Sequence, residues 1–70
     1  MPLSFARQGD IRKIVSLCGD EQLVKRLTEM GFTSGETVEV LDFTNAGMLL
    51  KIRGSKIAVN CGLTHYISVA

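Results

Sequence analysis

The residues in this chain with the chemistry to hold a metal ion are two cysteines and a single histidine. Cys61 and His65 are four positions apart, so a helical turn between them would present both side chains to one divalent transition metal ion. Cys18 could join them from across the fold. The alternative is that Cys61 continues the inward alternation of Ile57 and Val59, since free cysteine is among the most buried residue types. A lone histidine is weak support for a site, so we expect no resident cofactor.

Side chains suited to catalysis are not grouped in a recognisable pattern. A nucleophilic enzyme needs an activated Ser or Cys near a base, and His65 is the only histidine available. The glycines that could cradle a phosphate mark turns instead, and none opens a helix with phosphate-loop spacing. Asp20 and Glu21 are adjacent carboxylates, but the start of a helix explains both of them. We therefore expect a protein that is not an enzyme.

Composition places the chain among small globular domains. Its 70 residues are enough for one domain, residues 1–70, and 46% of them are hydrophobic, which is sufficient for a mainly aliphatic core. Eight basic and seven acidic residues give a net charge of +1 without runs of one sign. A nucleic-acid partner bound through bulk electrostatics is therefore disfavoured.

The same composition bears on location. No apolar run approaches the roughly 20 residues that span a bilayer, and the first residues lack the pattern of a signal peptide. Two cysteines without a CxxC motif fit a reducing compartment. We expect a cytoplasmic protein that does not insert into membranes, and a monomer rather than a strongly self-associating chain.

One short helix is expected between the first two strands. Residues 11–17, IRKIVSL, are rich in β-branched side chains and predict a strand. Asp20 is then a good N-cap residue, and Gly31 can end a helix in the left-handed conformation. Between them an apolar stripe recurs at helical spacing, made of Leu23, Leu27 and Met30. A helix near residues 20–30 follows.

Four further strands are expected, in residues 37–43, 48–53, 56–60 and 66–69. The alternation changes phase near residue 41, which indicates a β-bulge, and a Gly54-Ser55 connection predicts a tight hairpin. Leu3 and Phe5 are candidates to pin the N-terminus to the core. Five short strands cover their apolar faces best by curling into a small antiparallel barrel, with the helix capping one open end. The fold class is all-β with one short helix.

The polar side of the helix is a candidate docking surface. It carries Lys25, Arg26 and Glu29, which form either a solvated face or a contact surface for a partner. Phe32 follows directly, between two turn-forming glycines, and is either a core residue or an exposed aromatic anchor. Arginine adds the ability to make forked contacts to a carboxylate or phosphate.

The segment that links the helix to the second strand resembles a known signature. The run RLTEMGFTSGETVEVL is similar to the pattern R-L-x-E-[LM]-G-[LF]-x-x-G-x-x-[IV]-x-V of the bacterial FeoA proteins. The MPLS opening, the IVSLCGD turn, the IRGSKIAV hairpin and the terminal ISV agree with that family, so the resemblance covers essentially the whole chain. The chain departs from it with NAGM before the third strand and GLTHY before the last.

The resemblance implies an SH3-like barrel and a role in ferrous iron uptake. Proteins of this family act with FeoB, a membrane permease that carries a cytoplasmic GTP-binding domain, and Lys25, Arg26, Glu29 and Phe32 would then be the contact residues. Any metal held by Cys18, Cys61 and His65 would be Fe²⁺ or another divalent transition metal. The alternative is a free-standing regulatory domain related to the C-terminal domain of iron-dependent repressors. Balanced charge and few aromatic residues disfavour a third reading, an RNA-binding barrel.

Overall fold

The structure, a computed structural model, describes all 70 residues. Five strands and one longer helix occur in the predicted order: β1 (Ile11–Leu17), α1 (Glu21–Glu29), β2 (Thr37–Thr44), β3 (Gly47–Ile52), β4 (Ser55–Val59) and β5 (Ile67–Val69). Two short elements were not predicted, the 3-10 helix η1 (Leu3–Phe5) and the helical turn α2 (Cys61–Thr64). The predicted fold class is confirmed.

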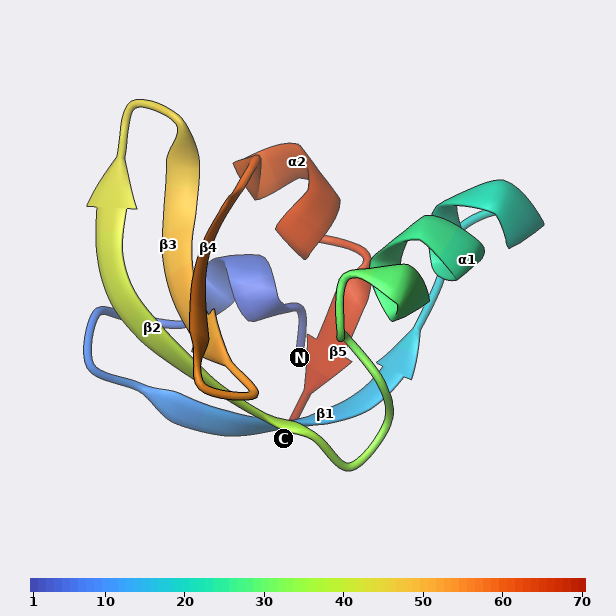
Figure 1. The fold of residues 1–70 in the computed structure, drawn as a ribbon, viewed down its shortest axis with the longest axis horizontal. Helices are drawn as coiled ribbons and strands as arrows, with labels where there is room; N and C mark the ends of the chain where they lie inside the picture. The colour runs from blue at the N-terminus through green and yellow to red at the C-terminus, as the bar shows by residue number, and fades with distance from the viewer.

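The strands form one antiparallel sheet in the order β4-β3-β2-β1-β5. It curls because β1 is shared: its first half pairs with β2 and its second half pairs with β5. The register of β1 with β5 shifts between Ile14 and Ser16, and that of β2 with β3 shifts between Val40 and Asp42. The second shift is the predicted bulge. Figure 1 shows the resulting curved sheet, with α1 on the side of β1 and β5.

The core is aliphatic with one buried aromatic ring. Alternate residues of β2, β3 and β5 are buried, as expected for strands with one face toward the core, and Val59 of β4 is buried with them. Thirteen side chains form the cluster: Leu3, Ala6, Ile14, Leu27, Phe32, Val38, Val40, Met48, Leu50, Ile52, Val59, Ile67 and Val69. Leu3 thus pins the N-terminus as expected, whereas Phe5 is 67% exposed and does not.

Helix α1 begins and ends where the sequence predicts. The Asp20 carboxylate accepts a hydrogen bond from the Leu23 amide at 2.8 Å, which satisfies one of the free donors of the first turn. Gly31 ends the helix with φ of 105°, a conformation that favours glycine. Leu27 is fully buried, while Leu23 and Met30 are partly buried against the core. The predicted stripe therefore attaches the helix to the barrel.

The connection between β3 and β4 differs from the prediction by one residue. Ile52 pairs with Ser55, so the two turn residues are Arg53 and Gly54 rather than Gly54 and Ser55. Both have positive φ, 52° and 79°, as a type I′ hairpin turn requires. The tight turn places an arginine at a position that usually holds asparagine or glycine.

None of the helices is both long enough and apolar enough to cross a lipid bilayer.

Candidate functional site

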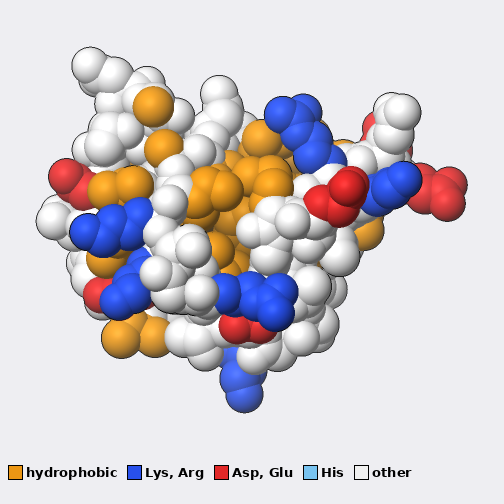
Figure 2. All heavy atoms as spheres, viewed as in Figure 1, with side chains coloured by type: hydrophobic (Ala, Val, Ile, Leu, Met, Phe, Trp, Pro, Cys, Tyr) orange, Lys and Arg blue, Asp and Glu red, His pale blue; other side chains and the backbone are white.

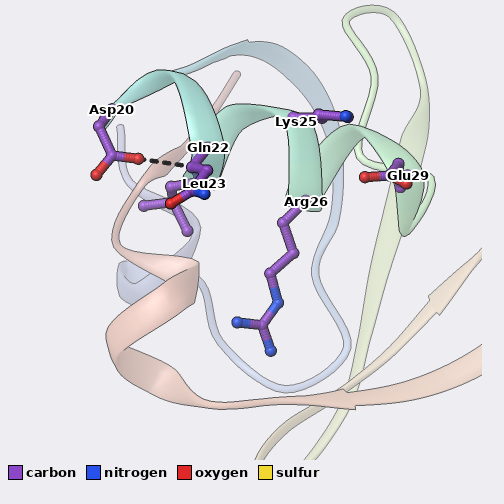
Figure 3. Close-up of a pocket in the computed structure, with 6 residues that line it drawn as sticks. All are labelled: Asp20, Gln22, Leu23, Lys25, Arg26 and Glu29. Carbon is purple, nitrogen blue, oxygen red and sulfur yellow. Dashed lines mark hydrogen bonds between the residues drawn. The ribbon is translucent and has the colours of Figure 1, made fainter.

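The outer face of α1 borders an open hollow of about 520 Å³. Its lining is almost wholly polar and comes from the helix and its cap: Asp20, Gln22, Leu23, Lys25, Arg26 and Glu29. Figure 3 shows Arg26 reaching away from the helix axis, with Lys25 and Glu29 leaving the helix in other directions. Three of the four predicted contact residues are nevertheless exposed and line this one hollow, and with Gln22 they make up the surface that we call the α1 face (Gln22, Lys25, Arg26 and Glu29).

The charged groups of the α1 face are not neutralised within the chain. The only ion pair in the structure joins Arg12 and Asp10, at 3.3 Å. Arg26 and Lys25 are exposed and make no ion pair with Glu29. Cations held in place by a helix but not paired can make charge-assisted bonds to a carboxylate or phosphate of another molecule.

Phe32 belongs to the core and not to this surface. Its side chain is 0% exposed, and its amide donates to the Leu27 carbonyl at 3.1 Å to close the end of α1. The expectation of an exposed aromatic anchor at this position is wrong. Gly31 turns the chain at the end of the helix, and the next side chain is buried in the same core cluster as Leu27.

The corner after α1 is tied to β1. The Gly35 amide donates to the Ile14 carbonyl at 2.8 Å, and the Ile14 amide donates to the Glu36 carbonyl at 2.8 Å. The Ser34 hydroxyl adds a bond to the Val15 carbonyl at 2.9 Å. These bonds hold the junction between helix and barrel in one geometry, so the α1 face is presented by a fixed scaffold.

The three candidate metal ligands do not form a site. Cys61 begins the helical turn α2 and His65 follows its last residue; the Asn60 side chain accepts from the Gly62 amide at 2.7 Å and caps the start of this turn. Cys61 is exposed, so its expected inward orientation is wrong. The Cys18 thiol donates a hydrogen bond to the Tyr66 carbonyl, with Sγ 3.5 Å from the oxygen. No group of three or more His, Cys, Asp or Glu side chains in the chain could hold a metal ion.

The neighbours of the His65 ring are two aromatic rings and a hydroxyl group. Its ring lies edge-on to Phe5, with centroids 6.4 Å apart, and edge-on to Tyr66 at 6.1 Å. Its Nδ1 lies 3.4 Å from the Ser4 hydroxyl. With no third donor beside Cys61 and His65, these residues do not fit a closed structural metal site.

A second hollow, of about 320 Å³, lies where the end of α1 meets the β3–β4 hairpin. Its apolar side chains are Met30, Ile52 and Ile57, and its charged ones are Glu29, Arg53 and Lys56. Figure 2 shows hydrophobic side chains gathered between β4 and α1, with Lys or Arg side chains beside them. Sequence reasoning did not identify this surface. The run RGSK was a usable signal, since it puts two cations at a hairpin tip.

The comparisons with known proteins agree with this architecture. The family described as the FeoA domain matches the chain over residues 1–70. A candidate Fe(2+) transport protein A of Methanocaldococcus jannaschii is 35% identical over 71 residues, which cover 97% of this chain and 83% of that protein. The crystal structure of an iron uptake regulatory protein, FeoA, has a TM-score of 0.90 at 29% identity and covers 99% of this chain and 92% of that one.

Two more distant structures share the fold. FeoA of Stenotrophomonas maltophilia, described as an SH3 domain protein and complexed with zinc, has a TM-score of 0.84 at 21% identity, with 100% of this chain and 89% of that chain covered. A manganese-dependent transcriptional repressor has a TM-score of 0.90 at 18% identity, but the match spans 35% of its chain. Together with the five-stranded antiparallel sheet, these likenesses identify the fold as SH3-like. The chain belongs to the FeoA family.

Proposed function

We propose that this protein is an accessory component of ferrous iron uptake and that it acts by binding a FeoB-type permease. The observation that carries the proposal is the family match over residues 1–70, together with 35% identity to an Fe(2+) transport protein over 97% of the chain. The protein acts in the cytoplasm as one domain, and it works as a binding partner and not as an enzyme.

The α1 face is the proposed contact surface. It offers two unpaired cations, Lys25 and Arg26, beside Glu29, on a helix that Leu27 anchors to the barrel. Such a mixed surface suits a partner that carries carboxylates together with at least one cation. Phe32 has no part in this contact, because it is buried.

A role in metal-dependent repression draws on fold likeness alone. The manganese-dependent repressor shares 18% identity with this chain, and a shared fold does not carry a shared function. A role in ferrous iron uptake is therefore the function that we propose, with iron as cargo of the permease rather than as an ion bound by Cys18, Cys61 and His65.

The test is a binding measurement with the soluble cytoplasmic domain of the permease, with and without guanine nucleotide. Arg26→Ala and Lys25→Ala should each weaken binding about two- to fivefold, because each removes one partly screened charge contact. Their melting temperatures should stay close to that of the parent protein, since both side chains are exposed.

Lys13→Ala removes an exposed lysine of β1 that does not line the hollow beside α1; it is the matched control and should bind like the parent. Equal binding by all of these proteins would place the contact elsewhere. If the soluble domain does not bind but the intact permease does, the contact lies on the membrane portion, and the same variants then test the α1 face there.

A further inference from the structure

The strand β4 has an open edge. It lies at the end of the sheet and pairs only with β3, from Ser55 opposite Ile52 to Val59 opposite Met48. The backbone of β4 makes no hydrogen bond to any element other than β3. In a hairpin closed by a two-residue turn, the closing pair exchanges hydrogen bonds and alternate residues face outward. The amides and carbonyls of Lys56 and Ala58 therefore point away from β3, and both residues are exposed.

A hollow borders this open edge. Met30, Ile52 and Ile57 supply its apolar side chains, and Ile57 itself belongs to β4. A strand laid beside β4 would turn every second side chain toward these residues and the others toward solvent. The hollow therefore suits an extended segment with an apolar residue at every second position.

The charges around the edge are mainly positive and unpaired. Arg53 and Lys56 line the hollow, and Lys51 lies directly opposite Lys56 on β3, where two like charges destabilise a strand pair. Glu29 lines the same hollow and Glu39 lies opposite Lys51, but neither forms an ion pair with these cations. Three cations against two carboxylates leave an excess that an acidic ligand would offset.

Arg53 gives the second line of support. Its φ of 52° is the only positive φ at a residue other than glycine, at a turn position that asparagine or glycine fills without strain. Its side chain runs along the end of α1, with its Cδ about 3.5 Å from where a side chain on Gly31 would begin. Arginine is thus held in a strained backbone conformation beside the hollow, where its guanidinium is available to a ligand.

We propose that the open edge of β4 binds an extended acidic peptide segment of a partner protein, which adds to the sheet as a sixth strand. The segment alternates apolar residues, which face Met30, Ile52 and Ile57, with acidic residues, which face Lys56 and Arg53. A second copy of this chain is a poorer occupant, because two β4 edges placed side by side would bring their Lys56 cations together. This site adjoins the α1 face, because Glu29 borders both surfaces, but the proposal does not depend on the proposed function.

The probe is a fluorescent eight-residue peptide that alternates glutamate and valine, tested against a matched peptide with lysine in place of glutamate. We expect the acidic peptide to bind saturably and the lysine peptide not to bind. Arg53→Asn and Lys56→Gln should each weaken it about two- to fivefold, as expected for one charge contact. Arg53→Asn should leave the melting temperature unchanged or raise it, because asparagine suits this turn. Lys25→Gln, on the α1 face, should bind the peptide like the parent.

Amide hydrogen exchange then separates strand addition from simple charge attraction. With the acidic peptide at about ten times its Kd, exchange at Lys56 and Ala58 should slow about tenfold, since these amides become bonded. Equal binding of both peptides, or exchange unchanged at both amides, would overturn the proposal. So would a dimer in sedimentation experiments that the peptide does not dissociate, because the occupant would then be a second copy. A drop in melting temperature for Arg53→Asn without weaker peptide binding would show that Arg53 only stabilises the end of α1.

Discussion

At the scale of single residues, Asp10 links the first turn to the barrel. Its carboxylate accepts from the Arg7 amide at 2.9 Å, and this bond lowers the pKa of Asp10 below its ordinary value of 3.8. The Arg12 guanidinium, at 3.3 Å, lowers the pKa further, against the effect of desolvation. On the backbone, the Val40 amide donates to the Asp10 carbonyl at 2.9 Å.

The predicted consequence is a loss of stability in acid. A carboxylate whose pKa is lower in the folded state stabilises that state above its unfolded pKa and stops doing so as the pH falls through the folded pKa. The free energy of unfolding of the parent should therefore exceed that of Asp10→Asn at neutral pH, and this difference should shrink below about pH 4. The measurement is denaturant unfolding at several pH values. An NMR titration that gives Asp10 a pKa above its ordinary value would contradict this account.

Residue orientation was the part of the site that the sequence predicted least well. Lys25, Arg26 and Glu29 are exposed as expected, since helical periodicity fixes which side of an anchored helix faces water. Phe32 comes after the end of α1 and Cys61 after the end of β4, so the periodicity of those elements does not predict which way either side chain points. Tertiary contacts decide there: Phe32 is buried, and Cys61 is exposed at the start of a helical turn that Asn60 caps.

At the scale of elements, the attachment of α1 rests on its apolar stripe. Leu27 is 0% exposed, and Leu23 and Met30 flank it against the core. Leu27→Ala should lower the free energy of unfolding by about 2 to 5 kcal/mol, because it removes buried methyl groups and leaves a cavity. Thr28→Ala, on the same helix but exposed, is the control and should change stability by less than about 1 kcal/mol. Equal melting temperatures for the parent and Leu27→Ala would show that the helix does not pack there.

The strands were predictable from their alternation of apolar and polar residues and from the turn residues between them. Val38 and Val40, which alternate with Thr37 and Glu39, marked the inward face of β2, and the phase change near residue 41 marked the bulge, seen as the register shift between Val40 and Asp42. The hairpin turn was misplaced by one residue because glycine was expected first, whereas Arg53 takes the positive φ before Gly54. A type I′ turn places its glycine second, so the Arg-Gly order was readable from the sequence.

At the scale of the whole molecule, α1 and the edge of β4 offer two adjoining surfaces on one barrel, which meet at Glu29. Bonds between Gly35, Ile14 and Glu36 fix the helix-to-barrel corner, and Leu3 buries the N-terminus in the same core. Gly47 shows how closely the chain packs here: its φ is 124°, and a Cβ at this position would collide with the Val59 carbonyl, so no larger residue fits. Partners therefore meet preformed surfaces, which favours binding without a large ordering cost.

The SH3-like architecture could be expected from the number of strands and the position of the helix, but partner choice could not. A fold of this kind serves FeoA proteins and part of a manganese-dependent repressor alike. Such proteins differ in the side chains on the surface of the barrel. Here the unpaired charges of Lys25 and Arg26 are the surface feature on which the proposed function depends.

The most direct test of that function is ferrous iron uptake through the permease, measured in cells that lack this protein and receive it back on a plasmid. The proposal predicts slow uptake without it, full restoration by the parent or by Lys13→Ala, and incomplete restoration by a Lys25→Ala, Arg26→Ala double variant that is equally abundant and equally stable. Uptake that is the same with and without the protein would contradict an accessory role, and full restoration by the double variant would contradict the α1 face as the surface that delivers it.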